Sequence, residues 1–376
     1  MKKNIHSISL LLLAISVFTS CSDDDSSTLQ SSEEMSQTIE QYVNNTVVVT
    51  YKLLADNALD LQTACEALQN NPTQVNVDAA CDKWIVARKY WEESEAFLYG
   101  AASDYNIDPH IDSWPLDKTQ LDNLLSNSTV MANFDADYAG TYLGYGLLGF
   151  HAVEYVLFRD GEPRDINDIS TTELKYMVGV AEDLARQTIR LEASWAGIDN
   201  VTTAKQTILS ESELEPSMNY GEALIAAGET GNTLYKSQIA AYVQILTGCM
   251  DIADEVGNTK ITDPVNSENV LDVESWYSWN SISDFSDNIR SVQNAYLGGR
   301  EGSRSSSLSV SHYIAEVDSE LDANIKAAIV TAINAIEAMP APFRNNLTWS
   351  TNNLAALNAC NNLMDLLNDA IETIQK

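Results

Sequence analysis

Long segments with a hydrophobic period of 3.6 residues dominate this chain of 376 residues, and the alternating pattern of β-strands is scarce. Amphipathic helices of this kind bury their apolar faces by packing against one another. We therefore predict an all-α fold made of helical bundles. The predicted helices cover residues 33–70, 76–100, 138–159, 170–197, 232–258, 279–297, 308–338 and 350–375.

Proline and glycine residues mark where the predicted helices end. Pro72 follows the first helix, and Gly100 stands at the end of the second, where a C-cap glycine is expected. The least regular stretch is 198–230, which contains glycine and proline residues. We place the boundary between two bundles there, and predict an N-terminal helical bundle at 33–200 and a C-terminal helical bundle at 201–376.

A faint internal repeat accompanies the two predicted bundles. Residues 94–100 and 293–299 share an Ala-aromatic-Leu-x-Gly pattern, and each segment lies at the end of a predicted helix. A duplicated bundle would leave such a repeat. Two helix ends can also resemble each other by chance, so both interpretations stay open.

The N-terminal segment is predicted to direct export. Residues 1–20 begin with a positively charged stretch and contain an apolar run at 8–18 that is too short to span a bilayer. The segment resembles a bacterial lipoprotein signal peptide, in which Cys21 becomes the lipidated first residue; a plain secretory signal with an incidental cysteine is the alternative. Residues 21–32 form an acidic tether, which resembles the surface-export signal of some Gram-negative groups. We expect an outer-membrane lipoprotein that faces the cell exterior, with a periplasm-facing orientation as the alternative.

The charge balance excludes two classes of partner. Lys and Arg number 21 against 54 Asp and Glu, which gives a formal net charge of −33. Nucleic acids require clustered basic residues, so the sequence predicts no nucleic-acid partner. An anionic lipid surface repels such a chain, and membrane attachment is therefore expected only through the lipid on Cys21. Cations are the ligand class that this field attracts.

Export also permits disulfide bonds. The cysteines that follow Cys21 are Cys65, Cys81, Cys249 and Cys360. Cys65 and Cys81 flank a predicted turn, so a helical hairpin could place them side by side. The sequence does not choose among the possible pairings, or between disulfides and buried free thiols.

The most informative segment is 139–158, which is apolar on every side when it is drawn as a helix. Apart from tyrosines, its ionisable residues are His151 and Glu154, which are three positions apart and share one face. Gly149 lies nearly opposite His151 and would let a neighbouring helix approach closely. Buried ionisable groups are costly unless they are paired or bind a metal. The spacing therefore indicates either a pair of metal ligands or a satisfied His–Glu pair in the core.

Two neighbouring segments carry further carboxylates. Arg88, Glu92 and Glu95 follow one face of the second predicted helix, with an intrahelical salt bridge as the simple alternative. Wheel angle does not decide whether Glu92 or Glu95 points inward. The proline-rich loop 108–117 is rigid enough to present Asp112 or its histidine to a site, although such a loop can also merely cap a helix.

The C-terminal half adds a polar stripe among aromatic residues. Segment 274–280 contains tryptophan and tyrosine, and Asn280, Asp284 and Asn288 follow at helical spacing. This stripe either borders a cleft or forms a solvated face. Signatures of common enzyme classes, namely HExxH, the P-loop, the dinucleotide fingerprint and Gly-x-Ser-x-Gly, do not occur in the sequence.

Taken together, these segments resemble the imelysin family, also called the M75 peptidase family. Its hallmark, a G-x-H-x-x-E motif, matches residues 149–154. Residues 91–100 followed by 111–117 look like the family's other N-terminal signature, and residues 278–298 look like its C-terminal one. The similarity extends from about residue 35 to the end of the chain.

The resemblance implies two helical bundles related by duplication, with the motif near the cleft between them and a link to iron. It also implies one set of metal ligands and one set of residues that support them or line the cleft. The implied ligands are His151 and Glu154, with Glu92 or Glu95 and with Asp112. The implied supporting or cleft residues are Arg88, Trp114, Gly149, Asn280, Asp284 and Asn288.

Three functions are weighed for such a protein. Several carboxylates and one histidine suit Fe³⁺ or Ca²⁺ better than a hydrolytic zinc. Because the resemblance implies a link to iron uptake, we favour a lipid-anchored protein that binds iron, or an iron complex, and passes it to membrane proteins of iron uptake. Zinc with M75-type metallopeptidase activity is the first alternative. The second alternative is a surface protein that binds a glycan, a haem carrier or a host protein through Trp276 and Trp279.

Overall fold

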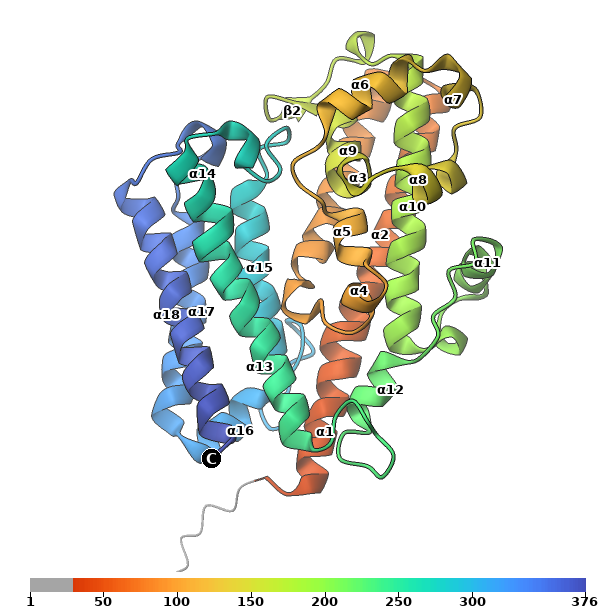
Figure 1. Ribbon diagram of the computed structural model, residues 1–376. Coiled ribbons are helices and arrows are strands. Elements are labelled where there is room, and N and C mark those ends of the chain that lie inside the picture. The colour runs from red at the N-terminus through yellow and green to blue at the C-terminus, as the bar shows by residue number, and fades with distance from the viewer. Residues whose placement is uncertain (1–29) are drawn as a thin grey trace, which may run out of the picture.

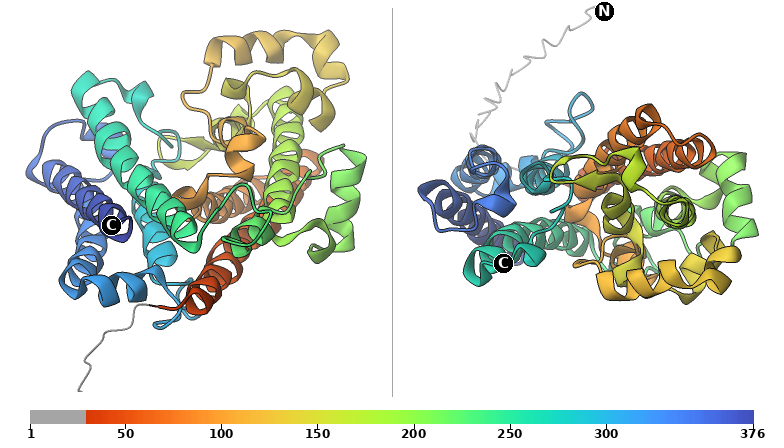
Figure 2. Two further views of the ribbon diagram at one scale, coloured as in Figure 1. Left: turned by 60° about the horizontal axis from the view of Figure 1, so that its bottom comes forward. Right: turned by 90° about the horizontal axis from the view of Figure 1, so that it is seen from above.

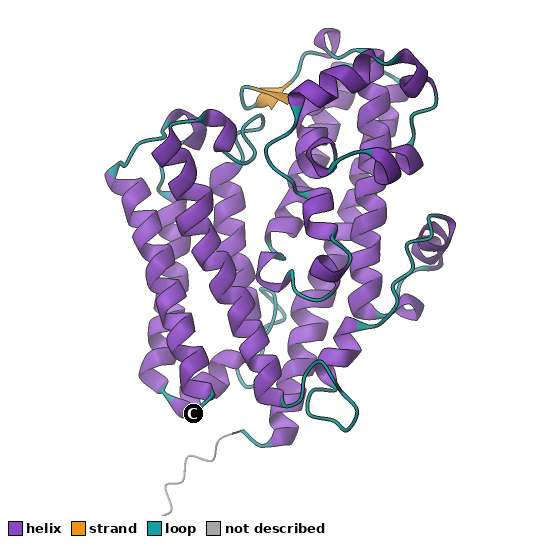
Figure 3. Cartoon of the chain, in the orientation of Figure 1, coloured by secondary structure: helices purple, strands orange, loops and turns teal. Residues whose placement is uncertain are grey.

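The computed structural model describes residues 30–376, and nearly all of its regular elements are helices, which confirms the all-α prediction (Figure 3). The predicted signal peptide, the lipidation site Cys21 and most of the tether lie outside the described residues. The α-helices are α1 (Ser32–Tyr42), α2 (Val48–Asn70), α3 (Gln74–Glu92), α4 (Ala101–Asp104), α5 (Ile107–Ile111), α6 (Lys118–Ser126), α7 (Ser128–Ala132), α8 (Ala136–Tyr142), α9 (Gly149–Leu157), α10 (Thr171–Ala196), α11 (Thr203–Glu211), α12 (Tyr220–Ile225), α13 (Gln238–Glu255), α14 (Thr262–Ser267), α15 (Ser281–Tyr296), α16 (Val310–Val317), α17 (Ser319–Glu337) and α18 (Thr351–Ile374).

Shorter elements connect these helices. Strands β1 (Phe158–Arg159) and β2 (Glu162–Pro163) form a small antiparallel hairpin. Two helical segments are π-helical, η1 (Val43–Val47) and η6 (Val256–Ile261). The 3₁₀ turns are η2 (Glu95–Phe97), η3 (Tyr145–Leu147), η4 (Ile166–Asp168), η5 (Ile198–Asn200), η7 (Val270–Asp272) and η8 (Phe343–Asn345).

The long helices form two groups that stand side by side (Figures 1 and 2). In the first group α2 packs between α3 and α10, and in the second α18 packs against α13 and α17, with α15 against α13 and α17. The groups meet where α15 contacts α3 and where α13 contacts η2. Helices α11 and α12 still contact α10, so the chain passes to the second group with α13. The division at residue 200 and the internal duplication stay predictions.

The predicted single helix at 138–159 is wrong, because the chain breaks into α8, the turn η3 and α9. The helical conformation already ends at Leu143, whose backbone is extended, and the φ of +73° at Gly149 is a left-handed conformation that a helix interior does not allow. Helix α9 nevertheless has the predicted environment, since every one of its residues is buried. His151 and Glu154 therefore lie in a short buried helix that begins at Gly149.

Other predicted helices end or break at identifiable residues. The second predicted helix stops at Glu92 instead of reaching residue 100, and the chain then forms η2. The predicted helix at 308–338 is interrupted at Asp318, whose carboxylate accepts hydrogen bonds from the backbone of Glu320 and Leu321 and so begins α17.

Among the described residues, no helix is both long and apolar enough to cross a bilayer.

The described cysteines are all free and buried. Cys65 on α2 and Cys81 on α3 lie on the two arms of the predicted hairpin, but they form no disulfide. Cys249 and Cys360 are likewise unpaired thiols. Burial raises the pKa of each of these thiols, to about 12 for Cys360, which makes them unreactive core residues.

Candidate functional site

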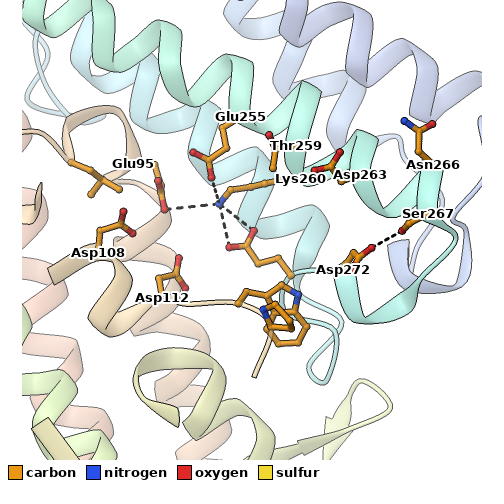
Figure 4. A pocket seen from close by; sticks show the side chains of 14 residues that line it. Glu95, Asp108, Asp112, Glu255, Thr259, Lys260, Asp263, Asn266, Ser267 and Asp272 are labelled. Atoms are coloured by element: carbon orange, nitrogen blue, oxygen red, sulfur yellow. Dashed lines mark hydrogen bonds and ion pairs between the residues drawn. The ribbon is translucent and has the colours of Figure 1, made fainter. Parts of the chain in front are cut away.

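Buried carboxylates from both helix groups converge on one pocket of about 830 Å³ (Figure 4). We call it the acidic pocket. Its wall includes Glu95 from η2, Asp108 from α5, Asp112 directly after α5, and Glu274 from the loop before α15. The full lining is Glu95, Leu98, Asp108, Asp112, Trp114, Pro115, Glu255, Thr259, Lys260, Asp263, Asn266, Ser267, Asp272 and Glu274.

Arg88 is the cation at the base of this cluster, and its side chain is fully buried. Its guanidinium contacts Asp112, lies 2.8 Å from Glu274 Oε1, and its Nε lies 3.7 Å from Asp284 Oδ2. It also pairs with Glu92 one turn along α3. Burial alone would lower the pKa of Arg88, but Asp112 and the other carboxylates outweigh burial and raise it well above its ordinary value. Arg88 is therefore a fixed positive charge that joins α3 to Asp112 on one side and to Glu274 and Asp284 on the other.

Lys260 is a second buried cation, and no sequence pattern predicts it there. It lies in the π-helical segment η6, its side chain is 8% exposed, and Nζ is 3.1 Å from Glu274 Oε2. Nζ also lies 4.0 Å from Glu95 and 3.8 Å from Glu255 (Figure 4). Burial opposes its charge, but Glu274 and Glu95 raise the pKa of Lys260 well above its ordinary value. A π-turn often marks a functional position, and here it delivers a lone lysine to the acidic pocket.

His151 sits between two carboxylates and is completely buried. Its Nδ1 lies 3.0 Å from Glu154 Oε2, its Nε2 lies 3.2 Å from Asp112 Oδ1, and the Trp114 ring centroid lies 4.8 Å from the imidazole centroid. Burial would lower the pKa of His151, but its contacts with Asp112 and Glu154 raise it to about 9. The ring therefore carries a positive charge at neutral pH unless a metal takes the place of a proton.

Glu154 is held from two sides inside the core. One oxygen, Oε2, faces His151, and the other, Oε1, accepts hydrogen bonds from the backbone N–H of Tyr277 at 3.1 Å and of Ser278 at 2.8 Å. The Ser278 hydroxyl donates to the same Oε1 at 2.7 Å. Glu154 thus ties α9 to the loop before α15 and fixes the orientation of the His151 ring.

Among the described residues, two sets of side chains could each bind a cation. In each set the ligand atoms lie within 4.8 Å of one another: Asp112, His151 and Glu274 form the first, and Glu92, Glu95 and Asp112 form the second. Asp112 belongs to both sets. Glu154, which the sequence predicts as a ligand, belongs to neither, because its oxygens face His151 and residues 277–278.

The structure places both Glu92 and Glu95 in the cluster. Their angle on a helical wheel could not decide which of the two points inward, because the helix does not continue through both residues. Helix α3 ends at Glu92, and η2 then turns Glu95 toward the same side. Burial raises the pKa of both carboxyls well above the ordinary value, against the effects of Arg88 on Glu92 and of Lys260 on Glu95. Burial also raises the pKa of Asp108 to about 6. An entering cation would therefore compete with protons for these carboxyls.

The polar stripe of α15 faces this cluster from the second helix group. Asn288 Nδ2 donates to Glu92 Oε2, and Asn280 Nδ2 donates to Asp284 Oδ1 at 2.6 Å. Burial raises the pKa of Asp284 to about 6, although Arg88 opposes this effect. These three residues lie beside the Arg88–Glu92 ion pair, but none of them lines the acidic pocket, so their role as a cleft border stays a prediction. His110, the other histidine of the predicted loop, lies 2.6 Å from Asp183 Oδ2, outside the acidic pocket.

Asp287, one residue before Asn288, is expected to make the stability of the protein depend on pH. Its side chain is 13% exposed, and burial followed by the nearby Glu93 raises its pKa to about 7, from an ordinary value of 3.8. The folded state therefore keeps a proton that the unfolded state releases, and this group lowers stability as pH rises from about 4 to about 7.

We expect Asp287→Asn to raise the free energy of unfolding at pH 8 by up to about 4 kcal/mol and to change it little at pH 4. Urea unfolding at both pH values measures this difference. Asp365→Asn, on an exposed position of α18, is the matched control and should change neither value. A gain that is the same at both pH values would contradict the assignment.

The fold and the site define an all-α protein with a buried acidic pocket between two groups of helices. A family model described as Imelysin, of the M75 peptidases, matches residues 47–370. The chain therefore belongs to the imelysin family, as the sequence resemblance predicted.

Named relatives agree with this membership. An iron-regulated protein A from Synechococcus elongatus is 29% identical over 324 residues, which cover 86% of this chain and 81% of the relative. A crystal structure from Parabacteroides distasonis, described as an iron-regulated protein A precursor, is 31% identical, with a TM-score of 0.79 over 93% of this chain and 97% of that one. An imelysin-like protein from Psychrobacter arcticum shares the fold, with a TM-score of 0.59, 13% identity and coverage of 93% and 96%.

Proposed function

We propose that this protein captures a metal cation in the acidic pocket, with iron as the first candidate and zinc or calcium as alternatives, as a component of iron uptake. The observation that carries the proposal is that ligand atoms of Asp112, His151 and Glu274 lie within 4.8 Å of one another, and that Asp112 and Glu274 line a pocket of about 830 Å³. The names of the relatives, which are iron-regulated proteins, support iron as the cargo.

The donor chemistry fits a hard cation. Asp112 and Glu274 supply carboxylate oxygens, and His151 supplies one nitrogen, an oxygen-rich set that suits Fe³⁺. The donor atoms have ion-pair partners inside the cluster that an entering metal would displace, since Lys260 Nζ lies 3.1 Å from Glu274 Oε2 and Asp112 Oδ1 lies 3.2 Å from His151 Nε2. Arg88 and Lys260 balance only part of the surrounding negative charge, so the pocket keeps an attraction for a further cation.

Glu154 has a supporting task in this proposal. Because its carboxylate accepts from residues 277–278 and faces His151 Nδ1, it leaves Nε2 of the imidazole directed to Asp112. A carboxylate behind a metal-binding histidine raises the basicity of the ring and fixes its rotation. The G-x-H-x-x-E motif would then supply one ligand and the group that orients it.

The positions of the histidines favour metal capture over peptide hydrolysis. Catalytic zinc sites in peptidases commonly use two histidines and a carboxylate. Of the histidines in the described part of the chain, His110 pairs with Asp183 and His312 pairs with Glu316 on α16, so His151 alone contacts a carboxylate that lines the acidic pocket, Asp112. The lipid anchor on Cys21, the outer-membrane location and delivery to membrane proteins of iron uptake are proposed from the sequence.

Elemental analysis of the purified protein tests the proposal. Protein dialysed against Fe³⁺, Zn²⁺ or Ca²⁺ should retain about one equivalent of metal, and the pair His151→Ala, Glu274→Gln should abolish retention. The control pair His312→Ala, Glu316→Gln removes a histidine and a glutamate that lie 3.4 Å apart near the surface, and should retain the metal. Equal retention by the two double variants would overturn the site, and retention of zinc alone would favour the hydrolytic alternative.

A further inference from the structure

A second pocket adjoins the acidic pocket and has the opposite chemistry. It measures about 500 Å³ and shares Trp114 and Pro115 with the acidic pocket. Its wall combines aromatic rings with basic side chains, a composition found where small organic ligands bind. We call it the cationic pocket; the residues that matter for its chemistry are Lys118, Tyr155, Arg159, Trp276, Tyr277 and Arg344.

The two arginines of this pocket lack close, buried acidic partners, whereas Lys118 pairs with the exposed Asp122 at 2.7 Å. Arg159 makes no ion pair with any described carboxylate; its Nη1 donates to the carbonyls of Tyr155 at 3.0 Å and Phe158 at 2.9 Å. Its guanidinium lies 4.4 Å from the Tyr155 ring centroid and 5.1 Å from that of Tyr277. Burial followed by the nearby Arg164 lowers the pKa of Arg159, as expected for a cation without a counterion.

Arg344 is held in a similar way on the other side of the pocket. Its Nη1 donates to the carbonyl of Trp276 at 2.9 Å, and its guanidinium lies 4.6 Å from the Trp276 ring centroid. The nearest carboxylate is Asp160, 3.7 Å away and 81% exposed, which makes it a weak counterion. The Nε of Arg344 and the indole N–H of Trp114 are buried and have no acceptor among the described residues.

We infer that the cationic pocket binds a small organic carboxylate, which is the chelating anion of the captured metal. The unpaired N–H donors and guanidinium groups recognise carboxylate oxygens, and the aromatic rings hold the guanidinium groups in place. This inference rests on the proposed function, because it treats the ligand as a metal chelate that spans the two adjoining pockets. The metal would then face Asp112 and His151, and the chelator would face Arg159 and Arg344.

Charge and size favour this class of ligand. A chain with a net charge of −33 repels an anionic chelate, unless the anionic part meets a local group of cations. The cationic pocket supplies such a group beside the acidic one. A volume of about 500 Å³ fits a small molecule and excludes a folded partner.

Isothermal titration of the purified protein with citrate, and separately with ferric citrate, tests the inference. We expect both to bind, and Arg159→Gln with Arg344→Gln to weaken both at least tenfold, which is about 1.4 kcal/mol. The control Arg186→Gln with Arg290→Gln removes two arginines that pair with surface carboxylates, and should leave both affinities unchanged. Lys118→Gln, at a position 56% exposed where folding is not at risk, should weaken binding by a smaller factor.

The outcomes separate this inference from the proposed function. Citrate binding that depends on Arg159 and Arg344, without retention of iron in the elemental analysis, would support the anion pocket and count against metal capture. Iron retention by a protein that binds neither citrate nor ferric citrate would support metal capture and count against the anion pocket. Equal citrate affinity in the arginine double variant and its control would overturn the inference.

Discussion

Gly149→Ala is expected to prevent stable folding, with a loss of more than about 4 kcal/mol in the free energy of unfolding. A Cβ at this position would lie 1.9 Å from the carbonyl oxygen of Ile111 and 2.2 Å from its carbonyl carbon. These are backbone atoms, so the clash cannot be relieved by a change of rotamer. The φ of +73° adds strain for any residue with a Cβ.

The same substitution would damage the candidate metal site, because Ile111 directly precedes Asp112. Thermal unfolding and near-ultraviolet circular dichroism measure the effect. Gly144→Ala is the matched control in the same segment, since a Cβ there would meet no atom within 4 Å. Melting temperatures for Gly149→Ala and Gly144→Ala that lie within a few degrees of each other would contradict the close contact.

Arg88→Met is expected to be the second most damaging change, with a cost of about 3–5 kcal/mol. Methionine keeps much of the volume but leaves the buried carboxylates of Glu92, Asp112 and Asp284 without their shared cation. Arg186→Met is the control, because Arg186 pairs with the exposed Asp137 and should lose less than about 1 kcal/mol.

Two further measurements identify the cause of the Arg88 effect. The loss should shrink at pH 5, where burial lets Glu92 and Asp284 take up protons, since the pKa of each is raised. Adding Asp284→Asn to Arg88→Met should recover part of the lost stability, as expected for groups in one network. Urea unfolding gives both values, and an equal loss at pH 5 and pH 8 without recovery would show that packing, not charge, explains the cost.

The helices could be predicted where the information is local. The hydrophobic period and the caps gave α10, α15 and α18 to within a few residues, because both signals lie within each segment. The break before α9 could not be predicted in the same way. It depends on the left-handed backbone of Gly149 and on a carbonyl from Ile111, which comes from a distant part of the sequence.

The candidate site could be predicted where a motif or a helical stripe marked its residues. His151, Asp112 and Asn288 were named from the sequence and lie in or beside the acidic cluster. Lys260 was missed because an isolated lysine carries no pattern, and only the meeting of η6 with η2 brings it to Glu95. Arg159 and Arg344 were missed for the same reason, since tertiary packing alone places them around one pocket.

Anomalous X-ray diffraction from crystals of the purified protein, grown with ferric citrate and measured above and below the iron absorption edge, tests the metal site most directly. We predict one strong iron peak in the acidic pocket within bonding distance of Asp112, His151 and Glu274. Electron density for citrate should extend from that peak past Trp114 toward Arg159 and Arg344. Iron bound to the protein with no peak in this pocket, or a peak bonded to Glu154 with Glu274 unbound, would contradict the assignment.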